Sequence, residues 1–287
     1  MNTALIVLNY NDADRTASLI KKISGYRSLT HIIIVDNCST DDSFEKLLPL
    51  ADSKIDVIRT ESNNGYASGN NAGVLFALKH YAPEYLFIAN PDVFFDDETA
   101  LAMLNALHNT PSYGVSAPLV RQGTNVWNLP GFAGIIESLF LVLFTLDKKR
   151  IRRNILNDSR SIVPVDVVEG SFLAIKADAW KKAHGFDNRT FLYAEEIIFS
   201  RRLRNAGFTE CVLKDYRYDH LHSASIKKAH RSRKAAAFHY FRDSFRIYNR
   251  FYLNTNPLQN IIFDICWDLG YIERCLYDII SSFKSGH

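Results

Sequence analysis

The sequence predicts an α/β protein with a mostly parallel central sheet flanked by helices, followed by a helical C-terminal extension. Two observations lead to this prediction. Over the first 110 residues, short apolar runs rich in Ile and Val alternate with segments of helical periodicity, which is typical of a parallel sheet with right-handed crossovers. From Ala235 to Phe283 the chain is rich in aromatic residues and its pattern is helical.

The first half accounts for four strands and the helices between them. The predicted strands are Ala4–Leu8, His31–Val35, Asp56–Arg59 and Tyr85–Ala89. The predicted helices are Thr16–Ile23, Ser43–Leu48, Ala72–His80 and Thr99–Leu107. The unbroken β-branched run Ile-Ile-Ile-Val before Asp36 suits a strand that is buried on both faces. Ligands of such sheets bind beyond the carboxyl ends of the strands, so the residues after each strand are the first candidates.

The second half is less regular. Ile135–Leu146 is almost wholly apolar, Val163–Ala174 suggests strands again, and Phe191–Ala206 has a helical pattern. We therefore expect a catalytic domain over residues 1–225 and a helical extension over 226–287. Within the catalytic domain, about 1–110 would form a nucleotide-binding half and about 111–225 an acceptor half.

Composition limits the class of protein. Over 287 residues, 47% hydrophobic and 23% charged content are typical of a globular chain, and a net charge of +3 is too weak to predict a nucleic-acid partner. The four cysteines have no C-x-x-C spacing, so free thiols are expected. The N-terminus has no basic leader, and no apolar run approaches the roughly 20 residues that span a bilayer. We expect a cytoplasmic protein.

Three candidate segments follow or join the predicted elements, and each has two open interpretations. Gly65, Gly69 and Gly73 form either a turn before a helix or a close approach to a nucleotide at a helix N-terminus. Asp36 is either an Asx turn or cap, or an acceptor for a nucleobase N–H or a ribose hydroxyl. Asp92 either belongs to a turn after Pro91 or holds a nucleotide-bound cation, for which one or two carboxylates suffice.

Two further pairs carry titratable groups. Glu195 and Glu196 lie among apolar and aromatic residues, where burial and mutual repulsion would raise at least one pKa and produce a general base. A solvated helix start is the alternative. His220 and His222 alternate and would share a face if extended; they are either structural or metal-binding.

Taken in order, seven segments resemble the family 2 glycosyltransferases of the GT-A fold, closest to the bacterial rhamnosyltransferase-like members. The resemblance covers about residues 3–250, and the ordered set is specific although no single motif is. The segments are NYN at 9–11, VDNCSTDDS at 35–43, NNGYASGNNAG at 63–73, NPD at 90–92, EGSFLAI at 169–175, GFDNRTFLYAEE at 185–196 and HLHSAS at 220–225.

The resemblance implies a role for each candidate. Leu8 and Tyr10 would flank the nucleobase that Asp36 reads, and Asn70 and Asn71 would lie on the nucleotide side. Asn90-Pro91-Asp92 matches the Asp-x-Asp signature, so Asp92 would hold the Mn or Mg ion that bridges the diphosphate, and His222 would complete the metal site. Glu196 matches the catalytic base and Glu195 the preceding acid. The segment His239–Arg242 is similar to the helix that ends the catalytic domain.

Three positions depart from the family pattern. Asn90 replaces the first aspartate of the signature, which would lower the metal affinity, and Glu196 is one methylene longer than the usual Asp. Ile198 stands where a second Asp is common, next to Ile197. Asn90 and Ile198 therefore leave open a catalytically impaired nucleotide-sugar-binding protein.

The implied function is an inverting, metal-dependent hexosyltransferase. It would move rhamnose or a similar hexose from a dTDP- or UDP-sugar to a saccharide or polyprenyl-diphosphate-linked acceptor in the synthesis of bacterial surface polysaccharide, such as O-antigen or capsule. A sugar nucleotidyltransferase is a further alternative, but Leu8–Asn11 offers no triphosphate loop rich in Gly and Lys.

A membrane surface is the last predicted partner. After the apolar run Ile135–Leu146, the six residues Lys148–Arg153 carry five positive charges. Each charge contributes about 1 kcal/mol near an anionic leaflet. The segment is interpreted either as a peripheral anchor on the inner face of the plasma membrane or as a buried core helix with a solvated basic end.

Overall fold

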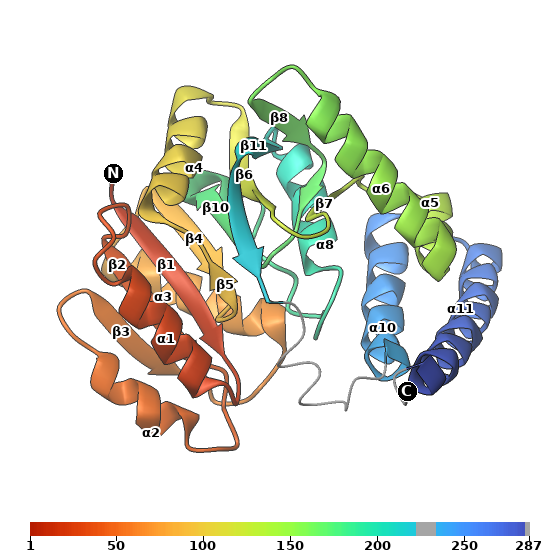
Figure 1. Cartoon of the computed structure of the whole chain (residues 1–287), viewed down its shortest axis with the longest axis horizontal. Helices are drawn as coiled ribbons and strands as arrows, with labels where there is room; N and C mark the ends of the chain where they lie inside the picture. Colours follow the sequence, from red (N-terminus) through yellow and green to blue (C-terminus); the bar gives the residue numbers. More distant parts are fainter. Residues whose placement is uncertain (222–233, 285–287) are drawn as a thin grey trace.

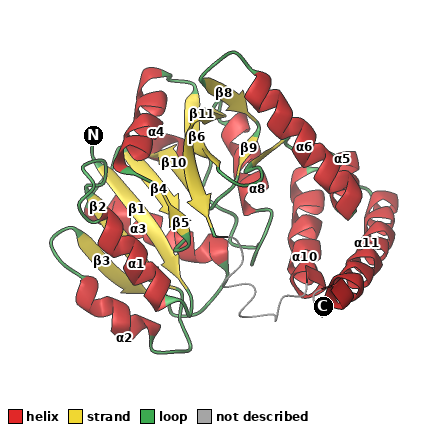
Figure 2. Cartoon of the chain, viewed as in Figure 1, coloured by secondary structure: helices red, strands yellow, loops and turns green. Residues whose placement is uncertain are grey.

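The computed structural model of the chain describes residues 1–221 and 234–284. A nine-stranded sheet in the order β3-β2-β1-β4-β10-β6-β11-β5, with β8 beside β11, forms its centre (Figures 1 and 2). A separate two-stranded sheet pairs β7 with β9. The strands are β1 (Thr3–Asn9), β2 (His31–Asp36), β3 (Ile55–Arg59), β4 (Tyr85–Ala89), β5 (Val93–Phe94), β6 (Tyr113–Val120), β7 (Val126–Trp127), β8 (Ile162–Val165), β9 (Val167–Val168), β10 (Phe172–Lys176) and β11 (Thr209–His220).

Helices cover the sheet, and a further group of helices lies beside it. They are α1 (Ala13–Ile23), α2 (Ser43–Leu47), α3 (Tyr66–His80), α4 (Asp97–Asn109), α5 (Phe132–Ser138), α6 (Leu141–Asn157), α7 (Ala177–Lys182), α8 (Glu195–Asn205), α10 (Lys234–Tyr252) and α11 (Pro257–Lys284), with a short 3-10 turn at Leu48–Leu50. Figure 1 shows α5, α6, α10 and α11 together beside the sheet. The α/β class and the helical C-terminal part are thus confirmed.

The four predicted strands of the first half are confirmed, and all run parallel. β1 pairs with β2 and with β4, and β2 pairs with β3. Alternate residues enter two apolar clusters, so Leu5 and Ile32 face α1 and α4 while Ile6 and Ile33 face α3. Each buried side chain of this size contributes about 1.5–3 kcal/mol, which explains why the β-branched runs were reliable signals.

Helix α3 begins at Tyr66, so its predicted start at Ala72 is wrong. The glycine-rich segment forms the first turns of the helix. A Cβ at Gly69 would lie 2.4 Å from Leu8 Cδ1, and one at Gly73 would lie 2.7 Å from Ile6 Cγ2. Glycine therefore lets the helix lie directly on β1, and this packing outweighs the cost of about 1 kcal/mol that each helical glycine carries.

The second half makes the main sheet mixed, since β6 and β11 keep the direction of β4 whereas β10 and β8 run the other way. β10 lies between β4 and β6 and runs antiparallel to both, with Phe172 opposite Ala89. The predicted strand region Val163–Ala174 contains β8, β9 and the first part of β10. The predicted helix Phe191–Ala206 begins only at Glu195.

The apolar run Ile135–Leu146 is divided between two helices. Ile135 and Leu139 are buried against the C-terminal helices, whereas Val142 is 63% and Leu146 58% exposed at the start of α6. The single buried core helix considered for this run is therefore wrong.

The C-terminal helices share one apolar cluster with the catalytic half. Phe245 and Tyr248 of α10 and Phe263 and Trp267 of α11 pack with residues of α5 and α8. The predicted boundary near residue 225 lies outside the described residues and remains a prediction. In residues 1–221 and 234–284, no helix combines the length and apolarity needed to cross a bilayer.

Candidate active site

The carboxyl ends of β1, β2 and β4 bring the first candidates to one edge of the sheet. Asn9 of β1 is in register with Asp36 of β2. The Asp36 carboxylate is fully buried and accepts hydrogen bonds from Asn9 Nδ2 at 3.0 Å and from the Ser39 amide at 3.1 Å. Arg59 Nε lies 3.3 Å from its Oδ2. Asp36 is therefore fixed in one orientation at this edge.

The neighbouring candidates differ in their exposure and in their hydrogen bonds within the protein. Tyr10, just beyond β1, is 42% exposed, and Leu8 contacts the glycine face of α3. Asn70 is fully buried and donates to Tyr66 O at 3.0 Å. Asn71 uses its whole amide to connect α3 to the loop before α8, because it donates to Phe186 O and to Asn188 Oδ1 and accepts from the Phe186 amide. Asn71 therefore has a clear structural function.

The segment after β4 places Asp92 beside β11. His220 of β11 is opposite Val93 of β5, and its Nε2 lies 3.3 Å from Asp92 Oδ1. Its Nδ1 lies 3.2 Å from Glu169 Oε1. Burial alone would lower the pKa of His220, but the hydrogen bonds to Asp92 and Glu169 outweigh it and raise the pKa to about 9. The imidazolium therefore bridges two carboxylates.

Glu195 and Glu196 form the first turn of α8. Tyr193 and Ala194 precede them with φ values of 72° and 64°, a left-handed conformation that is costly for residues with a Cβ. This backbone turns the helix start toward the sheet, and Glu195 is only 4% exposed. The solvated helix start considered from the sequence is therefore wrong for Glu195.

Residues 169–170 connect the two groups of candidates. The Gly170 amide donates to Glu196 Oε1 at 3.2 Å, and the neighbouring residue Glu169 contacts His220. The Tyr66 hydroxyl lies 2.7 Å from Gly170 O and 3.1 Å from Asn90 Oδ1. A Cβ at Gly170 would be 3.3 Å from the Glu196 side chain, so glycine permits this close approach.

Burial controls the protonation of the two glutamates. Burial and the charge of Glu196 raise the pKa of Glu195 well above its ordinary value. Burial also raises the pKa of Glu196 to about 7, although the Gly170 amide and the cation of Lys148 act in the opposite direction. The expected elevation of at least one pKa in this pair is confirmed. A carboxyl group near pKa 7 is suited to general base catalysis at neutral pH.

Lys148 of α6 faces this carboxylate group instead of the outer surface. Burial lowers its pKa, against the charges of Glu169 and Glu196. Its Nζ lies 4.6 Å from the centre of the Phe144 ring and 5.7 Å from that of Trp127. Lys148 thus supplies a positive charge beside the candidate base.

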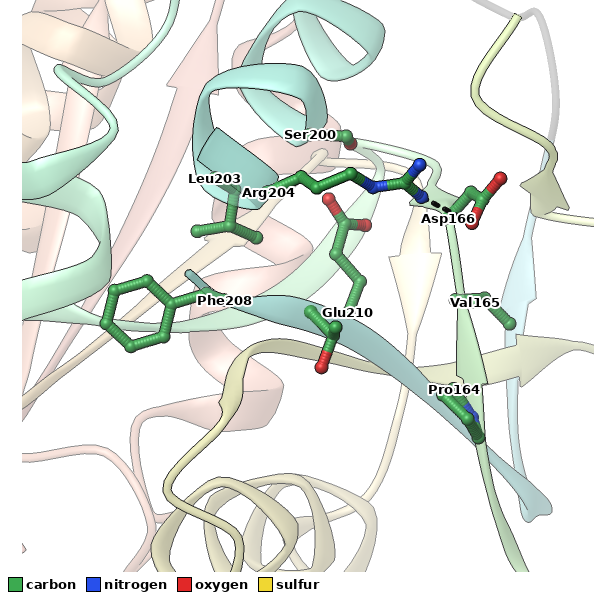
Figure 3. Close-up of a pocket in the computed structure, with 9 residues that line it drawn as sticks. Pro164, Val165, Asp166, Ser200, Leu203, Arg204, Phe208 and Glu210 are labelled. Carbon is green, nitrogen blue, oxygen red and sulfur yellow. Dashed lines mark hydrogen bonds and ion pairs between the residues drawn. The ribbon is translucent and has the colours of Figure 1, made fainter. Parts of the chain in front are cut away.

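A small cavity lies behind α8, between α8, β8 and β11 (Figure 3). Glu210 extends into it below Arg204, which pairs with Asp166 at 2.5 Å. Glu210 Oε2 accepts from the Val168 amide at 2.7 Å. Burial raises the pKa of Glu210 to about 8, against this hydrogen bond. Glu210 therefore supports the strand that leads to Glu169.

The donor set at Asp92 matches a cation shared with a ligand better than one held by protein alone. Within residues 1–221 and 234–284 there is no group of three or more His, Cys, Asp or Glu side chains that could hold a metal. Asp92, with Glu169 on the other side of His220, offers hard oxygen donors, and a nucleotide-bound Mn²⁺ or Mg²⁺ needs only one or two. His222, the other predicted ligand, lies outside the described residues.

Three residues of this site were not assigned from the sequence: Tyr66, Lys148 and Glu169. Glu169 and Tyr66 stand inside segments that carried the family resemblance, EGSFLAI and NNGYASGNNAG, which was the available signal. Lys148 was assigned to a basic surface, and only the path of α6 reveals that it faces inward.

Comparison with known proteins shows similarity to glycosyltransferases. The family model described as "Glycosyl transferase family 2" matches residues 4–165. The chain is 24% identical over 287 residues to the low-salt glycan biosynthesis hexosyltransferase Agl10 of Haloferax volcanii, covering 99% of this chain and 82% of that protein. It is 25% identical over 190 residues to the N-acetylglucosaminyl-diphospho-decaprenol L-rhamnosyltransferase of Mycobacterium tuberculosis, covering 62% of each.

Among solved structures, the mannosyltransferase PcManGT from Pyrobaculum calidifontis, in complex with GDP-Man and Mn²⁺, is similar. The TM-score is 0.62 at 15% identity, and the match covers 96% of this chain and 73% of that one. At this identity the likeness concerns the fold.

Proposed function

Because the chain belongs to glycosyl transferase family 2 and has the GT-A fold, we propose that it transfers a hexose, rhamnose or a similar sugar, from a nucleoside diphosphate sugar. The donor is of dTDP or UDP type, and the acceptor is a saccharide or a polyprenyl-diphosphate-linked saccharide in surface polysaccharide synthesis. The names of the haloarchaeal hexosyltransferase and the mycobacterial rhamnosyltransferase support the sugar and the lipid-linked acceptor.

One observation carries the proposal. The Asp92 side and the Glu196 side of the site meet at two consecutive residues, since Glu169 contacts His220 beside Asp92 and Gly170 donates to Glu196. In this proposal, the group that would hold the diphosphate lies next to a buried carboxylate whose pKa is about 7. This is the arrangement that direct transfer between a nucleotide sugar and a hydroxyl requires.

The proposed reaction is a single displacement with inversion. Glu196 takes the proton of the acceptor hydroxyl while that oxygen forms a bond to the anomeric carbon. The bond from that carbon to the diphosphate oxygen breaks, and the nucleoside diphosphate leaves with the electron pair. Glu195, buried and with a raised pKa, stays protonated and leaves the negative charge on its neighbour. No covalent intermediate is needed.

We assign the nucleotide to the edge formed by β1, β2 and α3. Leu8 and Tyr10 would flank the base, and Asp36 would accept from it. Asn70, Asn71 and Asn90 are the further polar residues that we assign to the nucleotide side. Asp92 would hold a Mn²⁺ or Mg²⁺ ion together with the diphosphate, and such an ion neutralises the charge that develops on the leaving group.

We also propose that α6 attaches the protein to an anionic membrane, which would bring the site to a lipid-linked acceptor at the inner face of the plasma membrane. Val142, Leu143 and Leu146 expose apolar surface at the start of α6, and the basic residues Lys149 and Arg153 follow on the same helix. Apolar surface next to positive charge is the combination that interfacial helices use.

The test of the function combines donor screening with the Asp92→Ala variant. Thermal stabilisation by UDP- and dTDP-sugars identifies the donor, since a tighter ligand stabilises more at a given concentration. Calorimetry with manganese and the matching nucleoside diphosphate should show that Asp92→Ala loses metal-dependent affinity, while its circular dichroism spectrum shows that it remains folded. Unchanged metal-dependent binding would contradict the assignment of Asp92. Donor binding without any hydrolysis or transfer would instead favour a binding protein that has lost catalysis.

A further inference from the structure

The last helix, α11, carries a long apolar face that the rest of the described chain leaves open. Seven Leu and Ile side chains form this face, and the exposed fractions are Leu258 65%, Ile262 38%, Ile265 54%, Leu269 52%, Ile272 53%, Leu276 54% and Ile279 53%. From Leu258 to Ile279 the row extends about 32 Å at 1.5 Å per residue. Soluble monomers rarely expose one contiguous apolar patch of more than a few hundred Å².

The opposite face of α11 is already in use. Phe263 and Trp267 are buried in the cluster formed with α10 and α5. A Cβ at Gly270 would lie 2.5 Å from Leu139 O, and Arg274 donates to that same carbonyl. The helix is therefore fixed on the molecule by this face and cannot rotate to bury the other one.

The spacing of the exposed row indicates which kind of partner can cover it. The steps from Leu258 to Ile279 are 4, 3, 4, 3, 4 and 3 residues, an unbroken heptad pattern with a period of 3.5. A strict 3.5-residue repeat keeps an apolar seam facing a partner helix in a left-handed coiled coil. The surface of a lipid bilayer imposes no such repeat.

We propose that α11 pairs with α11 of a second copy of this chain in an antiparallel coiled coil, giving a symmetric dimer. Equal spacing from a central axis puts Leu269 of one protomer in the same layer as Ile272 of its partner, and Ile262 in the same layer as Ile279. A twofold axis of this kind makes the interface self-complementary.

The charges at the edges of the seam select the antiparallel direction. Asp268 and Glu273 are charged residues at the flanking positions g and e, next to the apolar row. Glu273 Oε2 also accepts a hydrogen bond from the Leu141 amide at 2.8 Å. In a parallel pair each Asp268 would face Glu273 of the partner, which is repulsive. In the antiparallel pair Asp268 lies near Cys275 of the partner and Glu273 near Cys266, so no like charges meet.

The same charges argue against a lipid surface as the occupant. α11 contains four acidic residues and two basic ones, and the charged residues at the positions flanking the seam, Asp268 and Glu273, are both acidic. Helices that lie on anionic membranes carry Lys and Arg at the border of the apolar face. The acidic border of α11 would be repelled there, whereas the apolar seam itself is uncharged and matches a copy of itself.

Sedimentation equilibrium of the full chain tests the proposal. The wild type should have twice the monomer mass of 32.7 kDa. The Ile265→Lys/Ile272→Lys variant should be monomeric, with a dissociation constant raised roughly 100-fold or more, because lysine in an apolar seam is desolvated without a partner. Since both side chains are half exposed, the variant should keep its fold and its circular dichroism spectrum. The control Leu75→Lys, at an exposed position on α3, should remain a dimer.

Disulfide cross-linking tests the direction. Ile262→Cys mixed with Ile279→Cys should give a covalent dimer on oxidation, while either variant alone and the wild type should not. Cross-linking of Ile262→Cys alone would show a parallel pair and overturn the proposal. A monomeric wild type at high micromolar concentration, a trimer or tetramer, or a dimer unaffected by the two lysines would also overturn it. So would a monomer that binds phosphatidylserine vesicles through this face, lost in the lysine variant.

Discussion

At the scale of single residues, burial gives neighbouring carboxylates different properties. Glu195 and Glu196 are adjacent in the chain, yet only Glu196 receives a hydrogen bond from the Gly170 amide and lies near the cation of Lys148. Glu195 faces the apolar cluster, and its carboxyl oxygen Oε2 is buried with no hydrogen bond. The proton therefore resides preferentially on Glu195, which leaves Glu196 as the base.

Replacing Glu196 by Gln should lower the transfer rate by roughly two to four orders of magnitude, the usual contribution of a general base, while donor binding is kept. Because the pKa of Glu196 is about 7 and the base acts when deprotonated, the wild-type rate should rise with pH, reach half its maximum near pH 7 and level off above it. Steady-state kinetics from pH 5.5 to 8.5 checks both expectations. A larger loss in Glu195→Gln would show that the two roles are exchanged.

Glu210 should make the stability of the protein depend on pH. Its pKa is raised from 4.5 to about 8, so the native state retains a proton that the unfolded state has lost. The contribution of the protonated Glu210 to the free energy of unfolding is therefore fully present below pH 4.5. It is lost as the pH rises from 4.5 through 8. Above pH 8, Glu210→Gln should be more stable than the wild type, on the order of 2–4 kcal/mol. Urea denaturation at pH 5 and at pH 8.5 measures the difference, and equal wild-type and variant trends would contradict it.

The sequence allowed some of these residues to be predicted and not others. Glu195, Glu196, Asp36 and Asp92 follow or begin predicted elements, so their chemistry was visible along the chain. Glu169 lies in the short segment between β9 and β10, and His220 lies at the end of β11. Their contact depends on the tertiary arrangement of these strands, which no local sequence pattern encodes. His220 lies beside Asp92, which spacing alone could not show, and His222 lies outside the described residues.

At the scale of elements, packing determined where helices and strands begin and end wherever the local propensity was ambiguous. The strands were predictable because their β-branched runs are buried on both faces. The start of α3 was not, because its glycines are poor helix formers and only their contact with Leu8 and Ile6 accounts for them. The division of Ile135–Leu146 between α5 and α6 likewise follows from packing, since Ile135 and Leu139 are buried against the C-terminal helices whereas Val142 and Leu146 are exposed.

Helix α6 should bind anionic vesicles. Its exposed apolar start and the basic residues after it predict co-sedimentation with phosphatidylserine vesicles that decreases with salt, since each exposed cation contributes about 1 kcal/mol. Lys149→Gln/Arg152→Gln/Arg153→Gln should weaken binding, whereas Ile265→Lys on α11 should leave it unchanged. Lys148 is kept because it faces the site. A wild-type protein that stays in the supernatant at low salt would contradict the anchor.

At the scale of the whole molecule, the C-terminal helices are joined to the catalytic half by a polar cluster as well as by apolar packing. Asp187 pairs with Arg189 at 2.6 Å and with Arg202 at 3.4 Å, and the Tyr252 hydroxyl of α10 donates to it at 2.7 Å. Asp187 accepts hydrogen bonds from the Arg189 guanidinium, the Tyr252 hydroxyl and the Arg189 amide. These bonds hold its pKa at about 2 despite its burial. The helices themselves were predictable from composition, but their docking site was not.

Tyr252→Phe should destabilise the protein by about 1–2 kcal/mol, because the buried Asp187 carboxylate loses a donor. Urea denaturation at neutral pH measures the change. Tyr113→Phe is a suitable control, since the structure gives the Tyr113 hydroxyl no hydrogen bond and its loss should change stability little. Equal effects of the two substitutions would show that the cluster does not support the docking.

The position of β10 also determines the order in which the chain can fold. β4 and β6 are not neighbours in the sheet; β10 separates them and pairs with both, although it is synthesised after them. Until residues 172–176 leave the ribosome, the fully buried edge of β4 has no partner, and contacts that join such distant segments form slowly. The same late segment follows directly after Glu169 and Gly170. Pairing of the β4 edge is thus a late event in biosynthesis, and the site is completed later still, once Glu196 and His220 have followed. A nascent chain that ends before β10 exposes an aggregation-prone edge.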